Sequence, residues 1–290
     1  MKGKLCVITG ATSGIGEATA LDLGKLGADL ILVGRDERRG ESVVRKVSRL
    51  SKGGMARFIR LDLASPPQIR AAASIITSLQ RPVDVLLNNA GVRLDHYQEN
   101  DEGHELTFAT NHLGHFLLTG LLLERIIASD QGRIITVSSG SHGSARADGE
   151  WELRENNFDR RQAYAKSKLA NLLFAYELAR RLAGTNTLSC AFDPGGVASN
   201  FARYNGLWSW GKHLLSHALR RELVSPKTAA SALVHLAVTP SLPSLNGAYY
   251  HRREPLRSSP ASYEEAAARK LWALSLALTG LTTIQGPYAG

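Results

Sequence analysis

Short apolar runs, each followed by a stretch with helical character, are the feature that most constrains the fold of this chain. The runs are apolar at successive positions and lack the alternation of a strand that has one face in water. Such runs are typical of strands that are buried on both faces. They occupy residues 4–9, 28–34, 56–63, 83–89, 132–139, 187–192 and 247–251.

The segments between the runs have the length and composition of helices. Pro66 follows the third run, and it can begin a helix because proline is tolerated in the first turn. We predict helices at about 14–26, up to about 50, from 66 onward, and at 101–127, 162–183, 200–220, 226–237 and 260–278. Strands joined by helices with right-handed crossovers predict an α/β, doubly wound Rossmann fold with a mostly parallel seven-stranded sheet and helices on both faces.

One domain accounts for the whole chain. The sequence has 290 residues, of which 43% are apolar, enough for a large core. No Ser/Gly linker, charge block, repeat or low-complexity segment divides it. We therefore predict a single domain over residues 1–290.

Charge and cysteine usage bear on partners and compartment. The net charge is +9, but the arginines are scattered and form no basic stripe with interleaved aromatic residues, so we expect no nucleic-acid partner. A solvated surface and an anionic cofactor account for the charge. Cys6 and Cys190 each lie in an apolar run and lack metal-ligand spacing, which predicts buried thiols and no metal. No leader pattern and no apolar run of spanning length is present, so we expect a cytoplasmic chain without a membrane span.

A glycine-rich turn, TGATSGIG, follows the first strand and opens the first helix. Gly10, Gly14 and Gly16 let the backbone approach a pyrophosphate, and the start of the helix supplies N–H groups. The spacing differs from G-x-G-x-x-G, and the alternative is a merely tight turn. We expect a dinucleotide phosphate here, with Thr12, Ser13 and Ile15 beside it.

The end of the second strand selects the cofactor. An acidic residue there would accept the ribose hydroxyls of NAD, but this chain has Arg35, with Arg39 nearby. A guanidinium can pair with a 2′-phosphate, so we expect NADP(H); the alternative is a solvent-facing arginine. After the fourth strand, Asn89, Ala90 and Gly91 are small enough to let the backbone approach the same ligand.

Tyr164 and Lys168 could move a proton to or from a carbonyl oxygen. They lie four residues apart on a predicted helix and therefore share a face. A tyrosine pKa near 10 is too high for this task, and a neighbouring ammonium would lower the pKa. Ser139, which ends the fifth strand, could orient the same oxygen, and Asn111 could hold a water that links Lys168 to solvent. Alone, each of these residues has an ordinary structural explanation; their order along the chain supports a reaction centre.

The motifs TGATSGIG, NNAG, FATNHLGHF, ITVSS, YAKSK and DPGGV appear in this order. In them the chain resembles the short-chain dehydrogenase/reductase family over nearly its whole length. The resemblance implies a catalytic tetrad and a role for Tyr164 and Lys168 in binding the cofactor, Lys168 through the nicotinamide ribose. The tetrad is Asn111, Ser139, Tyr164 and Lys168. It also implies that Asp62 and Leu63 lie beside the adenine, and that Pro194, Gly195, Val197 and Ser199 lie beside the nicotinamide amide.

A narrower resemblance is to the retinol dehydrogenase-like branch. NHLGHFLLTGLLL, SKLANLLFAYELARRL and the tail from Ser259 carry it, together with the 25-residue gap between Ser139 and Tyr164. The branch generally prefers NADP(H) and acts on apolar aldehydes, ketones and alcohols. It usually has histidine before Pro-Gly, where this chain has Asp193, and a larger apolar residue at Gly196.

The resemblance also implies where substrate lies. Residues 196–225 would cover the nicotinamide as a substrate lid with an apolar wall, and the insert 140–163, with Trp151 and Phe158, would form another. A hydrophobic carbonyl compound would suit both walls. The Trp/Leu-rich face could instead make peripheral contact with a membrane. Helices 101–127 and 162–183 pair subunits in many relatives, which is compatible with a homodimer.

The predicted function is NADP(H)-dependent interconversion of an apolar aldehyde or ketone and its alcohol, with Tyr164 as general acid/base. Two alternatives remain open. One is NADPH-dependent reduction of an activated C=C bond, and the other is a non-catalytic NADP(H)-binding sensor.

Overall fold

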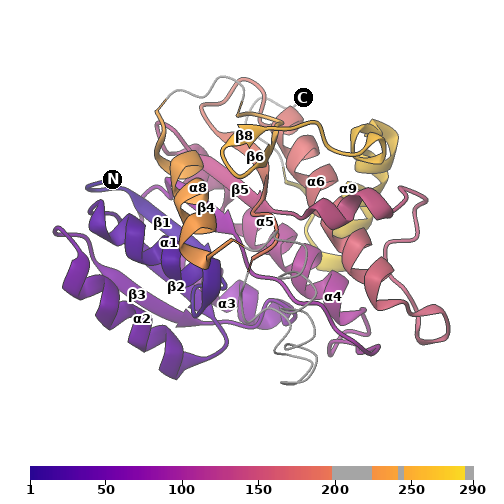
Figure 1. Ribbon diagram of the computed structural model, residues 1–290, viewed down its shortest axis with the longest axis horizontal. Helices are drawn as coiled ribbons and strands as arrows, with labels where there is room; N and C mark the ends of the chain where they lie inside the picture. The colour runs from indigo at the N-terminus through magenta and orange to yellow at the C-terminus, as the bar shows by residue number, and fades with distance from the viewer. Residues whose placement is uncertain (198–223, 241–244, 285–290) are drawn as a thin grey trace.

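A single twisted sheet forms the centre of the computed structural model, which describes residues 1–197, 224–240 and 245–284. Its strands lie in the order β3-β2-β1-β4-β5-β6-β7-β8. They are β1 (Leu5–Thr9), β2 (Asp29–Gly34), β3 (Ala56–Arg60), β4 (Val85–Asn88), β5 (Arg133–Val137), β6 (Leu188–Asp193), β7 (Tyr249–His251) and β8 (Glu254–Pro255). All neighbours pair in parallel except β7 and β8 (Figure 1).

This arrangement confirms the doubly wound Rossmann fold, with one strand more than predicted. The additional strand, β8, has two residues and pairs with β7 across a tight turn in which Arg252 has φ +57°. A strand this short leaves no apolar run in the sequence. The order reverses between β1 and β4, and in such sheets ligands bind at the carboxyl ends of the strands near the reversal.

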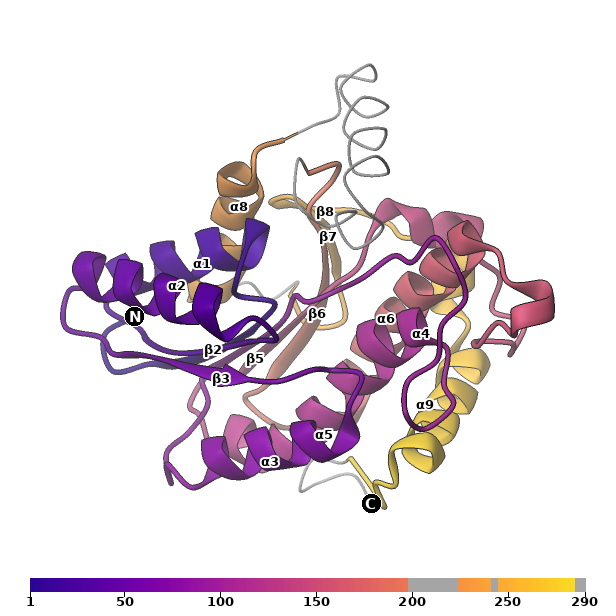
Figure 2. The ribbon, with the colours of Figure 1, turned by 90° about the horizontal axis from the view of Figure 1, so that it is seen from below.

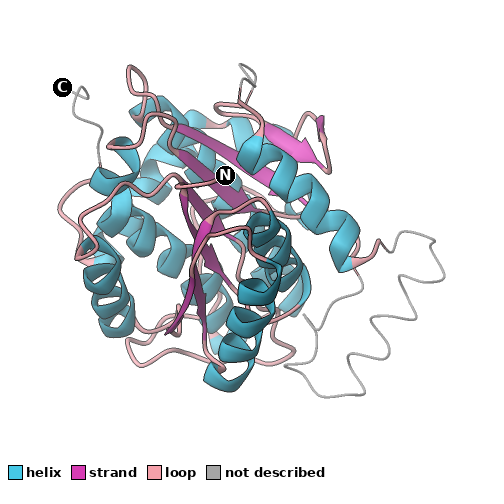
Figure 3. Ribbon diagram, turned by 90° about the vertical axis from the view of Figure 1, so that its left-hand side faces the viewer, coloured by secondary structure: helices cyan, strands magenta, loops and turns pink. Residues whose placement is uncertain are grey.

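Helices cover both faces of the sheet. Figure 2 shows α1 (Gly14–Lys25), α2 (Glu37–Leu50) and α8 (Pro226–Val238) on one side, with α3 (Pro66–Thr77), α5 (Gly114–Ile127) and α6 (Arg160–Arg181) on the other. The strands run through the middle of the molecule in Figure 3. The last helix, α9 (Glu265–Thr279), packs against α6 and not against the sheet.

Alternate residues of the central strands β1, β2 and β4 enter two different apolar cores. Leu5 and Val7 of β1 belong to the core under α3, α5 and α6, whereas Cys6 and Ile8 belong to the core under α1 and α8. Because both faces of the sheet are buried, both sets of positions are apolar, and the sequence shows no alternation. Cys6 and Cys190 are buried free thiols, as predicted.

The predicted helix 101–127 is wrong at its start. Residues 101–104 form a turn, in which Gly103 has φ +79°. The helix begins with α4 (Leu106–Phe108), where the Glu105 carboxylate accepts hydrogen bonds from the backbone N–H groups of Thr107 and Phe108. It continues through a π-helical turn, η1 (Ala109–Leu113), into α5.

Helix α6 is buried along most of its length. It begins at Arg160, two residues earlier than predicted, because the Asp159 side chain caps the N–H groups of Arg161 and Gln162. Every residue from Ala165 to Ala179 is buried within this one chain. Such a helix belongs to the interior of a protein.

The carboxyl-terminal elements follow the prediction where they are described. The segment predicted as 260–278 consists of a short 3₁₀ turn, η5 (Pro260–Tyr263), and α9. The predicted helix 200–220 and most of the predicted lid lie outside the described residues. The ends of that segment are joined, because Val197 bridges to Val224 and the Val224 N–H donates to the Gly196 carbonyl at 2.8 Å. Among the described helices, none combines the length and apolar character needed to cross a membrane.

Candidate functional site

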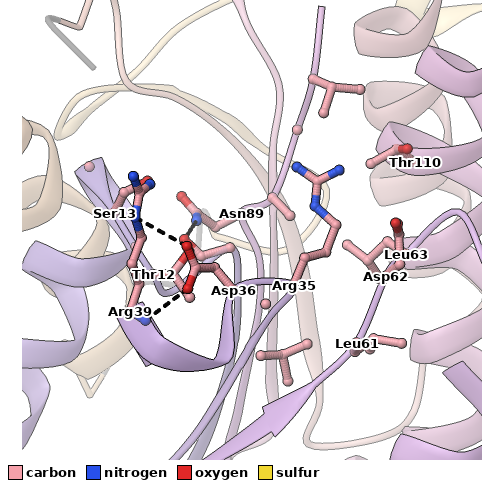
Figure 4. A pocket seen from close by; sticks show the side chains of 18 of the residues that line it. Thr12, Ser13, Arg35, Asp36, Arg39, Leu61, Asp62, Leu63, Asn89 and Thr110 are labelled. Carbon is pink, nitrogen blue, oxygen red and sulfur yellow. Dashed lines mark hydrogen bonds and ion pairs between the residues drawn. The ribbon is translucent and has the colours of Figure 1, made fainter. Parts of the chain in front are cut away.

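A cavity of about 430 Å³ opens at the carboxyl ends of β1, β2 and β4, where the strand order reverses (Figure 4). Its walls contain all the predicted cofactor residues of the glycine turn, the second and third strands and the NNAG motif. The residues that line it are Gly10, Thr12, Ser13, Gly14, Ile15, Gly16, Val33, Gly34, Arg35, Asp36, Arg39, Leu61, Asp62, Leu63, Asn89, Ala90, Gly91, Val92 and Thr110. Val33, Gly34, Asp36, Leu61, Val92 and Thr110 were not predicted, although each lies within two residues of a predicted site residue.

Two positions of the glycine turn accept no residue other than glycine. A Cβ at Gly10, where φ is +66°, would lie 2.9 Å from the Cα of Ala90. A Cβ at Gly16 would lie 2.3 Å from the carbonyl oxygen of Gly10. The turn leads directly into the start of α1 at Gly14, so the first N–H groups of the helix lie at the cavity. This geometry fits the pyrophosphate of a dinucleotide.

A buried polar network joins the turn to the NNAG motif. The hydroxyl of Thr9 accepts hydrogen bonds from the N–H groups of Asn89 (2.9 Å) and Ala90 (3.0 Å), and it lies 2.9 Å from Nε2 of His115. The Asn89 side chain donates to the Thr9 carbonyl at 2.7 Å. Thr9 and His115 therefore position the cavity wall. The sequence analysis missed both; a threonine that ends an otherwise apolar strand was the available signal.

Arg35, Asp36 and Arg39 follow β2 and make different contacts. Asp36 caps α2 by accepting from the N–H of Arg39 at 2.9 Å, and its carboxylate pairs with the Arg39 guanidinium at 3.2 Å. Figure 4 shows the Arg35 side chain on the other side of Asp36, between Asn89 and the Asp62–Leu63 wall. The nearest carboxylate to the strand end is thus already engaged by the protein.

Ser139, Tyr164 and Lys168 lie together at the carboxyl end of β5. Ser139 directly precedes the 3₁₀ turn η2 (Gly140–Ser144), while Tyr164 and Lys168 lie one turn apart on α6. The Lys168 ammonium lies 5.6 Å from the centre of the Tyr164 ring and donates to the Val137 carbonyl at 3.0 Å. The carboxyl end of β5 therefore holds a hydroxyl, a phenol and a buried ammonium together.

Burial dominates the proton affinities of this group. It raises the pKa of Tyr164 to about 12, although a hydrogen bond with Ser139 and the charge of Arg93 oppose the shift. It lowers the pKa of Lys168 to about 8. The expected lowering of the Tyr164 pKa by Lys168 is not seen in this arrangement, because the cost of burying a phenolate is the larger effect.

Asn111 occupies the π-helical turn and contacts the cavity wall. Its side-chain amide donates to the Val92 carbonyl (2.9 Å) and to the Ser167 hydroxyl (3.0 Å), and its oxygen accepts from the Val92 N–H (2.7 Å). The side chain therefore clamps the segment that follows NNAG. The predicted water between Asn111 and Lys168 stays a prediction.

The predicted nicotinamide loop follows β6. Pro194 and Gly195 lie there, with Gly195 at φ +77°, and Val197 pairs with Val224. Because β6 pairs with β5, this loop begins beside Ser139, but its residues are not part of the cavity wall described above. Ser199 lies outside the described residues.

Trp151 does not form a substrate wall. It is 4% exposed and belongs to an apolar cluster with Phe108 and Leu169. Lys166 holds the insert in place through Asp148, at 3.0 Å. Phe158 instead packs edge-on against Tyr97, with 5.8 Å between ring centres.

Metal-ligating side chains do not cluster in residues 1–197, 224–240 and 245–284: no group of three or more histidine, cysteine, aspartate or glutamate residues is placed to hold an ion.

Comparison with known proteins agrees with this geometry. The model of the short chain dehydrogenase family matches residues 4–209. Retinol dehydrogenase 13 of Homo sapiens is 36% identical over 284 residues, covering 96% of this chain and 85% of the relative. Human retinol dehydrogenase 11 is 36% identical over 281 residues, covering 97% and 87%.

Solved structures show the same fold. An uncharacterised protein from Mycobacterium paratuberculosis is 32% identical, with a TM-score of 0.76 over 96% of this chain and 94% of that one. L-Sorbose reductase from Gluconobacter frateurii, solved with NADPH and L-sorbose, has a TM-score of 0.70 at 22% identity, covering 90% and 97%. The matched family model, the relatives and the site together show that this chain belongs to the short-chain dehydrogenase/reductase family of oxidoreductases and is retinol dehydrogenase-like.

Proposed function

We propose that the protein is an NADP(H)-dependent oxidoreductase that interconverts an apolar aldehyde or ketone and its alcohol, with Tyr164 as general acid/base. The observation that carries the proposal is the grouping of Ser139, Tyr164 and Lys168 on the sheet edge that also carries the glycine-lined cavity. A phenol, a hydroxyl and an ammonium at one point can handle the proton of a carbonyl–alcohol pair.

The cavity has suitable groups for each end of the dinucleotide. The glycine turn and the start of α1 would hold the pyrophosphate, and Arg35 with Arg39 would hold a 2′-phosphate. Asp36 supports NADP(H) over NAD(H), because its carboxylate is committed to the α2 cap and to Arg39. When bound, the nicotinamide supplies or accepts the hydride.

The protein's own groups then manage the proton. In reduction, Tyr164 donates its phenolic proton to the carbonyl oxygen; in oxidation, its phenolate takes the proton of the alcohol. Ser139 hydrogen-bonds the same oxygen and orients it. Lys168, close to the Tyr164 ring, stabilises the phenolate that reduction leaves behind.

The substrate class rests on similarity. Human retinol dehydrogenases 11 and 13 are named for an apolar alcohol, and this chain matches them over nearly its whole length. We therefore propose an apolar aldehyde, ketone or alcohol as substrate. The cytoplasm is the proposed compartment, in keeping with the two buried free thiols.

The deciding experiment measures NADPH- and NADH-linked turnover across apolar aldehydes, ketones and enones, for the wild type and Tyr164→Phe. We expect NADPH-linked reduction that falls at least about 100-fold in the variant, the lower range for loss of a general acid. Tyr263→Phe, a change to a half-exposed tyrosine stacked on Tyr176, is the matched control and should keep full turnover.

Near-wild-type turnover of Tyr164→Phe, with cofactor binding retained, would show that Tyr164 is not the acid. Product analysis separates the reactions: an alcohol indicates C=O reduction, and a saturated carbonyl compound indicates C=C reduction.

A further inference from the structure

Asp193 is a buried carboxylate on the reacting side of the sheet. It ends β6, is 5% exposed, and pairs in register with His251 of β7. Its Oδ2 lies 3.6 Å from the position that a Cβ at Gly140 would occupy, and Gly140 directly follows Ser139. Asp193 therefore lies next to the reaction centre without belonging to the predicted tetrad.

Three donors hold this carboxylate in place. Oδ1 accepts from the Gly195 N–H at 2.8 Å. Oδ2 accepts from the Tyr249 hydroxyl at 2.9 Å and lies 3.2 Å from Nδ1 of His251. A buried carboxylate needs such hydrogen-bond partners.

The other titratable groups nearby come from three elements. From β7 and its turn come Tyr249, His251 and Arg252, and a Cβ at Gly195 would lie 3.7 Å from a guanidinium nitrogen of Arg252. From η2 comes His142, whose ring centre is 5.3 Å from that of Tyr249.

From α6 come Tyr164 and Lys168, and the Lys168 ammonium lies at the carbonyl of Val137, which pairs with Phe192 directly before Asp193. Arg93 acts electrostatically on Tyr164, and His115 of α5 interacts in the same way with Lys168. The charge of Asp193 raises the pKa of Lys168, against the effect of burial, and it also raises the pKa of Tyr164.

We propose that Asp193 is a positioning residue that places a fixed negative charge behind the Tyr164–Lys168 pair and thereby keeps Lys168 protonated. Burial alone disfavours the ammonium, which has a backbone carbonyl as its hydrogen-bond partner in the described structure. A neutral lysine could not stabilise a phenolate. Asp193 supplies the compensating charge from the neighbouring strand.

Asp193→Asn removes the negative charge while keeping the shape of the side chain. In Asp193→Asn the amide oxygen can still accept from the Gly195 N–H, while the amide nitrogen can donate to the Tyr249 oxygen. The turn at Pro194 is thus retained and the charge is lost. Tyr249→Phe is the matched control, because it removes one hydrogen bond but keeps the carboxylate.

The test is an NMR titration of lysine side chains in protein labelled selectively at lysine, with Lys168→Met used to assign the signal. Wild-type Lys168 should titrate at about pH 8. We expect Asp193→Asn to move this midpoint down by about one unit, as loss of a nearby opposite charge does. Tyr249→Phe should show no such downward shift.

An unchanged Lys168 midpoint in folded Asp193→Asn overturns the proposal, as does an equal shift in Tyr249→Phe, which would assign the effect to packing. If Asp193→Asn does not fold, Asp193→His replaces it. Histidine also removes the negative charge, so a downward shift is again expected, and an unchanged midpoint again overturns the proposal.

A second experiment measures the pH dependence of turnover to test whether the charge of Asp193 affects catalysis. This experiment rests on the function proposed above. Loss of Asp193 lowers the proton affinities of both Lys168 and Tyr164, so reduction should decline at a lower pH in Asp193→Asn than in the wild type. The titration needs no substrate. Absence of wild-type turnover would therefore count against the proposed function alone, while the Lys168 midpoint still decides the role of Asp193.

Discussion

Two arginines within five residues of each other have different surroundings. Arg39 is paired with Asp36 at the start of α2, whereas Arg35 extends between Asn89 and the Asp62–Leu63 wall (Figure 4). The arginine at the end of β2 is therefore placed to meet a ligand group within the cavity. Its contribution can be measured without knowledge of the substrate.

Arg35→Ala should weaken NADPH binding about 10- to 100-fold, the range for loss of a charged hydrogen bond. NADH, which lacks the 2′-phosphate, should be affected much less. Fluorescence titration with each cofactor measures both constants. Arg38→Ala is the control for net charge, since Arg38 is exposed and is not part of the cavity wall. Equal losses for NADPH and NADH would place the phosphate site elsewhere.

At the scale of elements, a buried arginine connects the sheet to the end of a helix. Arg133 of β5 is 4% exposed, and its guanidinium donates to the carbonyl of Leu236 at 2.7 Å and to that of Thr239. These carbonyls lie at the end of α8, where the helix leaves acceptors unsatisfied and where a positive charge is favourable. The side chain thus caps α8 from beneath.

Arg133→Met should lower the free energy of unfolding by about 2–3 kcal/mol, because it leaves buried carbonyls without a donor. Urea denaturation measures the change. Arg57→Met, on the exposed surface of β3, should stay within about 0.5 kcal/mol of the wild type. A similar small effect for both variants would show that α8 does not depend on the cap.

The elements differ in how far the sequence predicts them. β1 and β5 are mostly apolar, and α6 follows a capping aspartate, so local chemistry marks them. Residues 101–105 could not be separated from the helix, because the Glu105 cap becomes visible only when its carboxylate turns back onto Thr107 and Phe108. β8 forms only through its pairing with β7.

The site residues also differ in how far the sequence predicts them. Glycines with a steric requirement, such as Gly10 and Gly16, follow from a local motif. The roles of Thr9 and His115 depend on contacts between residues 106 positions apart, which no local pattern reveals. Trp151 is a large aromatic residue of the kind that can line a pocket, but it lies in the core. Tertiary packing decides whether such a side chain is buried.

At the scale of the whole molecule, α9 forms an outer layer against α6 (Figure 1). Trp272 of α9 joins the layers: its ring centre is 5.1 Å from Phe116 of α5 and 5.9 Å from Phe174 of α6. The Arg181 guanidinium lies 4.4 Å from the same ring. The predicted homodimer through α5 and α6 stays a prediction, and any such pairing has to accommodate this layer.

Trp272→Ala should lower the free energy of unfolding by about 3–5 kcal/mol, the usual cost of removing a buried aromatic side chain. Thermal and urea denaturation measure the loss, and Lys270→Ala, exposed on the same helix, is the control. If Trp272→Ala were as stable as the control, α9 would be a peripheral addition and not part of the core.

The bridge between Val197 and Val224 has a consequence for how such a protein can change. Val197 and Val224 pair directly, so the two ends of the intervening segment meet at one point of the domain. The cost of closing a loop grows slowly with its length. The length of chain between these two residues can therefore change at little cost, while the sheet, the glycine turn and the proton-handling groups keep their places.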